Sequence, residues 1–517
     1  MSNQYDVIII GSGLGGLTAA ALLAQAGRKV LVIERNRSVG GAASTYKVGD
    51  LVIEGSLHET SDPRNPLDPK HEALARLGVL ESVDWVPVGS LFEVRGGPVG
   101  APFLLPDSFA GARSALIDRF PSARGNIAAV LDEIESMTAG LGVLMRGRDA
   151  FRNPREGFSA LLKLAPMVRG WRLSLGKVLE RNFGSNEAVK FALAANLAYY
   201  HDDPDRLWWI FFAIAQGGYL QSGGQYIRGG SKKLSEALAG VIAGAGGEIL
   251  LGRTASTIRL DGNGLPRSVA HTDSRGGDEA EAEAPIVVGN AAPAVLADML
   301  PEPARGRFRA SHAGRSQSIS LFAATFGLSV RPAELGMRAY STFLLPQWMR
   351  TLAQFRDGSV VMRSPPAGQI PAMAVVDYSR IDSGLGGPPY PVSVVGPDRV
   401  SNWVDLDRPT YEDKRKRWSE AIVATIDREF PGFASHVVAS QFNTARSLAT
   451  YLNAPQGAIY GFAPVPPSGP IWRGAGRSPK TAISGLYLAS AYAGTGGFTG
   501  SIVAGAGAAD LIIAKSR

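Results

Sequence analysis

The sequence predicts an α/β fold: a Rossmann-like unit of parallel strands and helices, with a mixed-sheet part and a largely helical region beside it. Three observations support this prediction. The chain opens on a short apolar run, a glycine-rich turn and an Ala/Leu-rich stretch, which is the order of strand, turn and helix. A second strand, glycine loop and small-residue helix follow near the other end. The length of 517 residues is too great for one small core, so we expect at least two intertwined domains.

The opening elements indicate a dinucleotide site. Residues 7–10 form an apolar run typical of a buried parallel strand. Gly11, Gly13 and Gly16 then give the pattern G-x-G-x-x-G. The first glycine allows a tight turn, the second lets the backbone approach a pyrophosphate, and the third lets the helix pack close to the strand. A second apolar strand ends at Glu34, where a carboxylate can accept hydrogen bonds from a ribose.

A second glycine pair follows this acid. Gly40 and Gly41 expose backbone N–H groups and add little bulk, so we expect them to line the same pyrophosphate from the other side. Ser44 and Thr45 add hydroxyl donors. The arrangement E-x5-G-G-x-x-[ST] resembles the FAD site of the amine oxidase and phytoene desaturase flavoproteins, and this resemblance implies FAD as the cofactor.

The later elements continue the α/β pattern. The sequence predicts a glycine-rich loop over 217–231, a helix over 232–245, strands over 246–251, 254–258 and 285–290, and a hairpin with an exposed loop over 261–283. Near the C-terminus, residues 485–489 form a strand, followed by a glycine loop to Gly500 and a helix over 501–514. The start of such a helix favours the negative charge that a reduced flavin develops.

Composition excludes several kinds of chemistry. The chain has no cysteine, which rules out disulfides within it, thiol catalysis and thiolate metal sites. Its six histidines show no metal-binding spacing, so we expect no metal. No secretory leader and no run of about eighteen uninterrupted apolar residues is visible. We therefore expect a cytoplasmic protein, with a peripheral position on the cytoplasmic face of a membrane as the alternative.

The net charge is +7, but the sequence contains no nucleic-acid-binding motif, so we expect no nucleic-acid partner. Basic residues are concentrated between Arg146 and Lys190, where they are interspersed with Leu, Phe and Trp. This pattern suits both a membrane-interface helix and an ordinary helix with its apolar face in the core. Residues 206–215, which are strongly apolar and aromatic, leave a similar choice between lining an apolar tunnel and filling a core.

Longer motifs make the resemblance more specific. Tyr226–Ser231 reads Y-x-R-G-G-S, Tyr451–Gly461 reads Y-L-x-A-P-x-G-x-x-Y-G, and Ile53–His58 is loosely similar to F-D-x-G-x-H. Nearly end to end, the chain resembles the phytoene desaturase-related flavoproteins of the amine oxidase superfamily, within them the carotenoid isomerase and retinol saturase branch. It departs from the family pattern at Ser490 and Ala491, and in the F-D-x-G-x-H segment it matches outright only at His58.

The resemblance implies noncovalent FAD and a long apolar polyene or isoprenoid substrate, reached from the membrane. The reaction would be hydride exchange between a substrate carbon and flavin N5, seen as desaturation, saturation or cis–trans isomerisation. Glu34 would hold the adenosine ribose, Ala255 the adenine through its backbone, and Thr499 and Gly500 would lie under the flavin. The full expected cofactor set is Gly11, Gly13, Leu14, Gly15, Gly16, Glu34, Arg35, Gly40, Gly41, Ala42, Ser44, Thr45, Ala255, Asn290, Gly497, Thr499 and Gly500.

The expected parts of the chain are FAD-binding stretches at 1–65, 221–300 and 441–517, a largely helical substrate or membrane-associating region at 66–220, and a substrate domain at 301–440. Candidate catalytic residues are His58, as an acid or base near neutral pH, with Arg228 and Tyr460 bordering the substrate; each suits a structural role as well. Two alternative functions stay open: an amine oxidase-like flavoenzyme with a small polar substrate, and a non-catalytic flavin-binding, lipid-associated protein. The sequence leaves the oligomeric state open.

Overall fold

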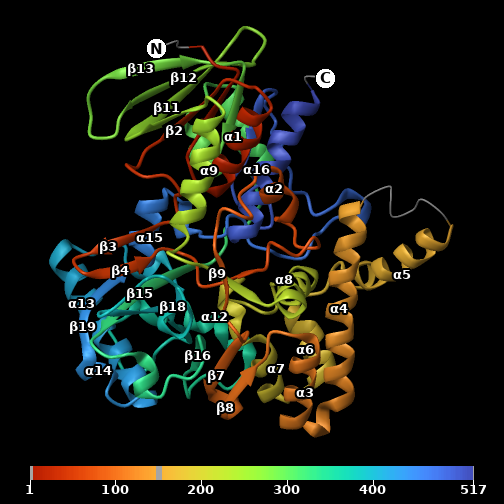
Figure 1. Cartoon of the computed structure of the whole chain (residues 1–517), viewed down its shortest axis with the longest axis vertical. Coiled ribbons are helices and arrows are strands. Elements are labelled where there is room, and N and C mark those ends of the chain that lie inside the picture. The colour runs from red at the N-terminus through yellow and green to blue at the C-terminus, as the bar shows by residue number, and fades with distance from the viewer. Residues whose placement is uncertain (1–3, 147–153, 516–517) are drawn as a thin grey trace.

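The computed structural model describes residues 4–146 and 154–515, and its upper half in Figure 1 is built on a five-stranded sheet. All neighbouring strands in this sheet are parallel. Their order is β10 (Glu248–Leu251), β2 (Val30–Glu34), β1 (Val7–Ile10), β14 (Ile286–Gly289) and β20 (Leu486–Leu488). The sheet thus joins strands that lie far apart in the sequence.

The strands of this sheet are apolar throughout because both of their faces are covered. Alternate residues, such as Val7 and Ile9, pack against helices α1 (Leu14–Gln25), α9 (Lys232–Gly244) and α16 (Gly497–Ala514). The residues between them, such as Ile8 and Ile10, form a second core on the opposite face. That core is completed by β11 (Arg253–Leu260), β12 (Pro266–Asp273), β13 (Glu279–Glu283), α10 (Pro293–Asp298) and α11 (Ala304–His312).

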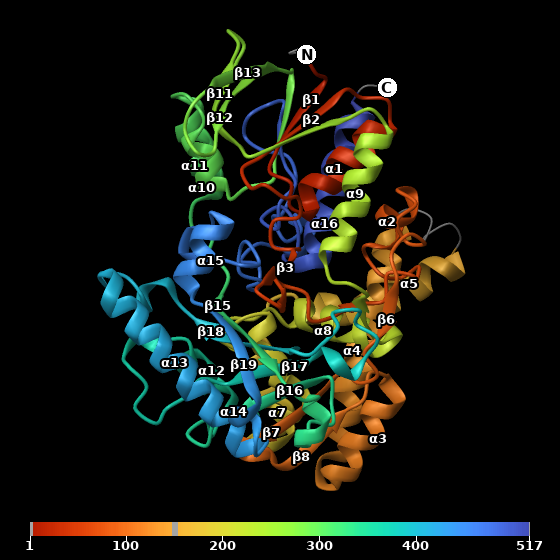
Figure 2. The ribbon, with the colours of Figure 1, turned by 60° about the vertical axis from the view of Figure 1, so that its left-hand side comes forward.

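The lower half holds a mixed seven-stranded sheet (Figure 2). Its order is β19 (Val437–Asn443), β15 (Ser320–Leu328), β18 (Tyr390–Asp398), β17 (Met373–Asp377), β16 (Ser341–Leu345), β7 (Phe92–Gly96) and β8 (Gly100–Leu105). Only the β16–β7 pair is parallel among these described strands. One face packs on α13 (Arg408–Glu429), and the other faces the helical region.

The helical region lies at the lower right of Figure 1. It consists of α3 (Phe109–Arg119), α4 (Arg124–Arg146), α5 (Pro154–Gly170), α6 (Leu175–Phe183), α7 (Glu187–Ala194) and α8 (Trp209–Ser222). Helix α5 projects from the body beside α4. The remaining elements used below are the pair β3 (Thr45–Val48) and β4 (Leu51–Glu54), the small sheet β5 (Thr60–Ser61), β9 (Gly224–Ile227) and β6 (Trp85–Pro87), and helices α2 (His71–Arg76), α12 (Phe355–Gly358), α14 (Phe433–His436) and α15 (Ala445–Leu452).

The predicted fold class, a Rossmann-like domain with a mixed-sheet part and a helical region, is confirmed. The expected boundaries of the parts remain a prediction. The five Rossmann strands all come from the stretches 1–65, 221–300 and 441–517. One local prediction differs from the structure, because α16 begins at Gly497 rather than at residue 501. The hairpin predicted within 261–283 is present as the antiparallel strands β12 and β13.

The predicted loop over 217–231 is wrong over most of its length, because α8 continues to Ser222 and residues 224–227 form β9. The reason lies at Gly217. A Cβ there would come 1.9 Å from the hydroxyl of Thr138 on α4, so the glycine allows two helices to touch. A glycine pair that resembles a turn signal therefore serves close helix packing.

The basic, apolar segment between Arg146 and Lys190 divides between its two predicted roles. Helix α6 buries Leu175, Val178 and Leu179 in the core. Helix α5 instead leaves Phe158 65% exposed and Leu161 61% exposed. Core packing therefore accounts for α6, and an exposed apolar face remains on α5. Positions 147–153 of this segment lie outside the described residues.

Helix α16 passes a test of length and composition for crossing a membrane, and it does so alone among the described helices. It is partly buried and packs against α1 at the side of the Rossmann sheet. Its polar residues include Thr499, Ser501 and Asp510. Length and composition by themselves are weak evidence for a span, and the packing on α1 is that of a core helix.

Candidate functional site

A single cavity of about 1460 Å³ extends from the Rossmann sheet to helices α4, α5 and α8. Its walls are of two kinds. Glycines and polar groups from the starts of α1 and α16 form the first part, which we call the glycine wall. Side chains of α4, α5 and α8 form the second, which we call the apolar wall.

The glycine wall brings the two predicted glycine motifs together. Gly13 and Gly40 form an isolated parallel bridge, and a Cβ on Gly41 would meet the Cα of Gly13 at 3.3 Å. Gly40 has a φ of +111°, a left-handed conformation that favours glycine. Gly11 and Gly13 of the first motif and Gly40 and Gly41 of the second therefore line one space with bare backbone, as a pyrophosphate requires.

Two helices begin at this wall without a side-chain cap. Helix α1 follows Gly13, and α16 follows Gly496; neither N-cap residue offers a side-chain acceptor to the first turn. The first N–H groups of an α-helix have no partner within the helix and carry a partial positive charge. Gly13, Leu14, Gly496 and Gly497 all line the cavity, so both starts offer their charge to it.

Glu34 lies at the end of β2, where the cavity begins. Its Oε2 accepts hydrogen bonds from the backbone N–H and the hydroxyl of Ser12, both at 2.7 Å. Its Oε1 accepts from the N–H of Asn36 at 2.7 Å. The side chain is buried, with 5% exposed, yet it borders the cavity. These bonds orient the carboxylate beside the glycine turn.

Most predicted site residues line this cavity. The set is Gly11, Gly13, Leu14, Glu34, Arg35, Gly40, Gly41, Ala42, Ser44, Thr45, His58, Ala255, Asn290, Tyr460, Gly497 and Thr499. The structure thus gathers residues from both ends and the middle of the chain. Their assignment as ligand contacts remains a prediction.

Four predicted residues do not line the cavity. A Cβ on Gly15 would come 1.6 Å from the Ala489 carbonyl oxygen, and one on Gly16 would come 2.1 Å from that of Gly11. A Cβ on Gly500 would come 2.9 Å from the carbonyl carbon of Thr495. These three glycines permit close packing of backbone segments. Arg228 lies at the surface, where it pairs with Asp382 at 3.1 Å.

Glu54 braces the loop that carries Ser44 and Thr45. Its buried carboxylate accepts hydrogen bonds from the Thr45 hydroxyl at 3.0 Å, from the Ser231 N–H at 2.9 Å and from the Tyr226 hydroxyl at 3.2 Å. Burial raises its pKa, and the hydrogen bonds from Ser231, Leu57 and Ser56 act in the opposite direction. The glutamate that departs from the family aspartate thus ties β3 and β4 to the start of α9.

His58 faces the cavity from the loop after β4. Its Nδ1 lies 2.7 Å from the Tyr199 hydroxyl and its Nε2 lies 3.0 Å from the Ser393 hydroxyl. Burial lowers its pKa to about 4, so the imidazole is neutral at pH 7. A neutral ring between two hydroxyls orients them, and it carries no proton to donate as an imidazolium at neutral pH.

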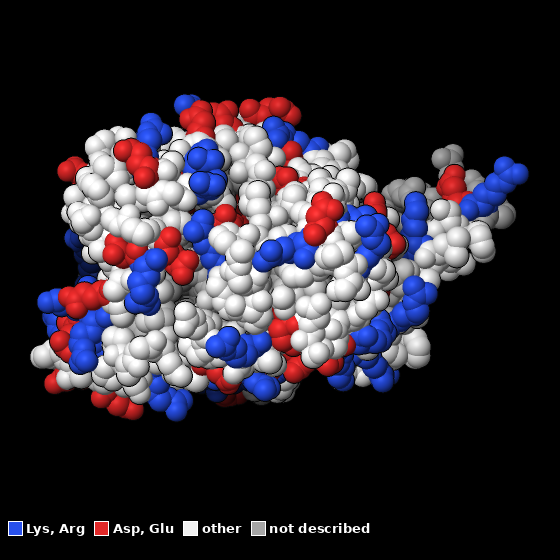
Figure 3. Space-filling view, turned by 90° about the horizontal axis from the view of Figure 1, so that it is seen from below, with Lys and Arg blue, Asp and Glu red and all other residues white. Residues whose placement is uncertain are grey.

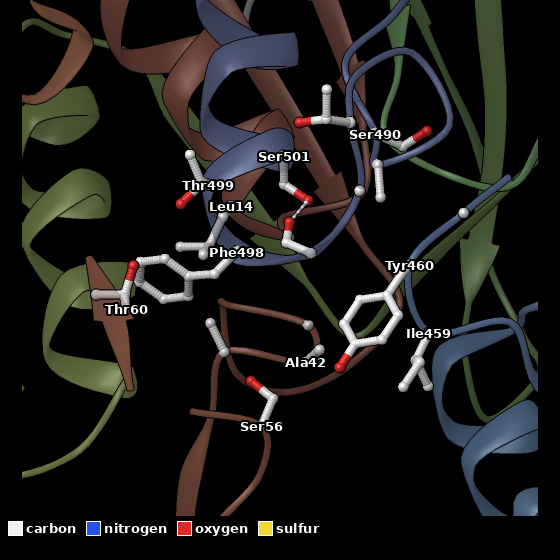
Figure 4. A pocket seen from close by; sticks show the side chains of 18 of the residues that line it. Leu14, Ala42, Ser56, Thr60, Ile459, Tyr460, Ser490, Phe498, Thr499 and Ser501 are labelled. Atoms are coloured by element: carbon white, nitrogen blue, oxygen red, sulfur yellow. Dashed lines mark hydrogen bonds between the residues drawn. The ribbon is translucent and has the colours of Figure 1, made fainter. Parts of the chain in front are cut away.

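Tyr460 reaches the cavity from the opposite side. In Figure 4 its ring and the ring of Phe498 lie on opposite sides of the space above Ala42 and Ser56. A Cβ on Gly497 would meet the Tyr460 ring at 3.4 Å, so the tyrosine packs beside the start of α16. Burial raises the pKa of Tyr460, which keeps the phenol protonated at physiological pH.

The apolar stretch 206–215 serves both of its predicted roles. In α8, Trp209 and Phe212 are buried in the core below the cavity. Ile210, Phe211 and Ile214 line the cavity itself. The remaining apolar wall comes from α4, α5 and their neighbours: Leu141, Leu144, Leu164, Met167, Val168, Trp171 and Trp208.

The cavity reaches the surface beside α4 and α5. Leu144 and Val168 line it and are 56% and 57% exposed, and Leu67, at 43%, lies with them. These side chains are exposed apolar groups at the rim of an apolar cavity. The exposed part of the cavity lining is therefore apolar at these three positions.

Sequence reasoning missed a polar cluster within this wall. Glu59, Asn196, Tyr199, Tyr200 and Tyr219 all line the cavity. They come from the β4–β5 loop, the turn after α7, and α8. No local spacing links these segments, so only the apposition of helices reveals the cluster. Among residues 4–146 and 154–515, no three His, Asp or Glu side chains are grouped to hold a metal ion.

Comparison with known proteins agrees with this geometry. The model of the NAD(P)-binding Rossmann-like domain matches residues 9–67. Human all-trans-retinol 13,14-reductase is 27% identical over 300 residues, which cover 56% of this chain and 47% of the human protein. The zebrafish (Danio rerio) all-trans-retinol 13,14-reductase is 22% identical over 96% of this chain and 84% of its own. The chloroplastic prolycopene isomerase of Daucus carota is 43% identical over 84 residues, 15% of this chain and 13% of the carrot protein.

The chain spans about half the length of the first curated relatives that it matches. Among solved structures, a putrescine oxidase variant superposes with a TM-score of 0.64 at 15% identity, covering 99% of both chains. An oxidoreductase from Methanosarcina mazei superposes with a TM-score of 0.63 at 16% identity, covering 98% of this chain and 99% of the other. At these identities the likeness concerns the fold. The dinucleotide-type Rossmann unit and the predicted resemblance are confirmed: the chain is similar to all-trans-retinol 13,14-reductases and, over a shorter segment, to a prolycopene isomerase.

Proposed function

We propose that this protein is an FAD-dependent oxidoreductase that acts on C=C or C–C bonds of an apolar polyene or isoprenoid. The observation that carries the proposal is the continuity of one cavity, whose glycine wall suits a dinucleotide and whose apolar wall suits a long hydrocarbon chain. The retinol reductase and prolycopene isomerase relatives support this substrate class.

The residues of the glycine wall fit FAD. Bare backbone at Gly13 and Gly41 leaves room for a pyrophosphate, and the start of α1 offers it N–H groups. Glu34 would accept hydrogen bonds from the ribose, and Ala255 would contact the adenine. The uncapped start of α16 at Gly497 and Thr499 would face the flavin ring. When bound, FAD supplies a hydride acceptor or donor at flavin N5.

The protein's own groups bind and orient the substrate. The apolar wall excludes water and holds a hydrocarbon chain, while Tyr460 beside the start of α16 limits where that chain can lie. His58 would act by positioning Tyr199 and Ser393, because its imidazole is neutral at pH 7. Arg228, at the surface beside Asp382, is not included among the substrate contacts.

The test is spectroscopic. We expect purified protein to be yellow or to take up FAD, and we expect its reduced form to be reoxidised anaerobically by a polyene or isoprenoid. Protein that stays colourless with excess FAD overturns the proposal. Flavin reduced by an amine, without polyene turnover, supports the amine oxidase-like alternative. Flavin that stays inert to all these lipids supports a non-catalytic lipid-associated protein.

A peripheral membrane contact belongs to the same proposal. Exposed Phe158, Leu161 and Leu162 lie on α5, next to the cavity rim at Val168. The exposed basic residues beside them are Arg155, Lys163, Arg169 and Arg172. Figure 3 shows this projection standing away from the body, with blue side chains at its tip and white surface behind. Such a face suits insertion into an anionic membrane, which would deliver the substrate to the rim.

We expect the protein to cosediment with vesicles that contain anionic lipid and to bind less to neutral ones. The double substitution Phe158→Ser and Leu161→Ser should reduce vesicle binding at least tenfold, because it removes apolar area that inserts. A matched control is Val438→Ser, which removes an exposed apolar side chain on β19, away from the cavity. Equal loss in both variants, or none in the α5 variant, contradicts membrane contact through α5.

A further inference from the structure

The cavity contains a carboxyl group that its apolar surroundings do not explain. Glu59 follows His58 in the loop before β5 and lines the cavity. Its Oε2 is fully buried without a hydrogen-bond partner. No hydrogen bond to its Oε1 is found among the described residues either, and the residue, which is half-buried, lines the cavity. A buried polar group left without a partner costs stability, so it calls for an explanation.

The neighbours of Glu59 are also polar and incompletely paired. Asn196 donates to Gln216 Oε1 at 2.9 Å, but its own Oδ1 is buried without a partner. The Tyr219 hydroxyl donates to the backbone oxygen of Glu59 at 3.3 Å. Burial and next the nearby carboxyl of Glu59 raise the pKa of Tyr200. Phenol, amide and carboxyl groups therefore lie near one another among the residues that line the cavity.

The carboxyl is in its neutral form at pH 7. Burial, with a smaller effect from Asp107, raises the pKa of Glu59 to about 8. A neutral carboxyl both donates and accepts one hydrogen bond, and it can approach an uncharged ligand without the cost of desolvating an ion. Its hydrogen-bonding capacity suits a hydroxyl or a carbonyl oxygen.

We propose that Glu59 is a specificity-determining residue that hydrogen-bonds an oxygen atom of the substrate, so that this enzyme takes isoprenoids ending in a hydroxyl or carbonyl group in preference to hydrocarbons. The inference rests on the proposed function, and it narrows the substrate class at the same cavity. A purely hydrocarbon ligand would cover Glu59 and leave its carboxyl without a hydrogen-bond partner. An oxygenated end group gives the carboxyl its partner, while the apolar wall holds the rest of the chain.

The test compares three ligands that differ in one group: geranylgeraniol, its aldehyde, and the hydrocarbon in which a methyl group replaces the CH₂OH group. Dissociation constants are measured on the flavin-loaded full chain by quenching of tryptophan fluorescence, since Trp171 and Trp208 line the cavity. We expect the alcohol and the aldehyde to bind at least tenfold more tightly than the hydrocarbon at pH 7. Equal binding of all three overturns the proposal and leaves water as the partner of Glu59.

Variants sharpen the result. Glu59→Leu should abolish the difference between alcohol and hydrocarbon, whereas Glu59→Gln, which keeps a donor and an acceptor, should retain most of it. Leu164→Ala is the matched control: it shortens the apolar wall and should weaken all three ligands alike. If Glu59→Leu does not fold, the Glu59→Gln variant and the comparison of the three ligands in the unaltered chain still test whether Glu59 binds the oxygenated end group.

Failure of the proposed function is distinguishable from failure of this inference. A protein that takes up no FAD but still prefers the alcohol loses the proposed oxidoreductase activity and keeps the Glu59 subsite. A protein that binds FAD and turns over hydrocarbons and alcohols equally keeps the activity and loses the subsite.

Discussion

The glycine wall and the apolar wall of the same cavity are built in opposite ways. The glycine wall presents backbone: bare N–H groups at the starts of α1 and α16, with Gly13 and Gly40 side by side. The apolar wall presents side chains from α4, α5 and α8, interrupted by the polar group around Glu59. A wall of backbone tolerates no added atoms, whereas a wall of side chains can change its ligand by substitution. The first therefore suits an unchanging cofactor and the second a variable substrate.

The largest expected effect is on the glycine wall. Gly13→Val should weaken FAD binding at least a hundredfold, because a Cβ there would come 2.7 Å from Asn290 Nδ2 and the side chain would occupy the path of the pyrophosphate. Flavin retained after desalting measures the loss. Gly240→Ala on α9, where a Cβ meets nothing within 4 Å, is the control and should keep its flavin. Normal flavin content in the Gly13 variant would contradict the assignment.

On the apolar wall, we expect substitution of Glu59 to change the free energy of unfolding rather than the amount of bound flavin. The pKa of Glu59 rises from 4.5 in the unfolded chain to about 8 in the fold. The folded protein thus holds a proton that the unfolded chain releases, so the free energy of unfolding falls as pH rises from about 4.5 to 8. Glu59→Gln cannot ionise, so the free energy of unfolding of the variant lacks this dependence on pH. Between pH 5 and pH 8, we expect the free energy of unfolding of the variant to rise by about 2 kcal/mol relative to that of the unaltered chain. Each unit of pKa shift corresponds to about 1.4 kcal/mol, and solvent in the cavity screens part of the shift.

Denaturant unfolding at the two pH values measures this difference. Parallel pH profiles for the two proteins would mean that Glu59 is solvated and ionises normally, and the contrast between the two walls would then weaken. Glu248→Gln on β10 provides a comparison carboxyl that lies outside the cavity.

A smaller effect is expected at Glu34. Glu34→Gln keeps the shape of the side chain but removes the charge that accepts from Ser12 and Asn36, and it offers the ribose a weaker acceptor. We expect FAD affinity to fall about tenfold, measured by titration of the apoprotein. An unchanged dissociation constant would show that the ribose lies elsewhere.

The smallest effect is expected at His58. Burial lowers the pKa of His58 to about 4, so this histidine does not change its charge between pH 6 and 7. We therefore expect the turnover rate to depend on pH in the same way in the unaltered chain and in His58→Gln over this range. The glutamine can still contact the hydroxyls of Tyr199 and Ser393, so the pH profile should keep its shape. An inflection near pH 6.5 in the unaltered chain that the variant lacks would make His58 an acid or base in turnover.

Much of the glycine wall could be predicted from the sequence because its information is local. The spacing of Gly11, Gly13 and Glu34 within one strand–turn–helix–strand unit predicts where each lies, and the structure gathers these residues as expected. Gly15, Gly16 and Gly500 were harder: in sequence a glycine for close packing looks the same as a glycine beside a ligand. Gly217 shows the same ambiguity between a turn and a helix contact.

The apolar wall was predictable only in outline. The amphipathic pattern of the segment after residue 146 predicts helices, but the core takes up α6 and leaves α5 exposed, a choice that depends on distant elements. Glu59 and Asn196 are 137 positions apart in the sequence, and only the fold places both on the wall of one cavity. Arg228 illustrates the converse, since a motif match gave no information about which way its side chain points.

The order of strands in the Rossmann sheet has a consequence for biosynthesis. Strand β1 leaves the ribosome long before its neighbour β14, which ends at residue 289, and before β20 and the start of α16, which follow only after residue 485. Contacts between such distant segments form slowly. A nascent chain therefore exposes edges of its apolar strands until β20 and α16 have been made, and the predicted cofactor site is complete only then. Uptake of the cofactor then coincides with completion of the fold, so newly made chains depend on protection from aggregation until that moment.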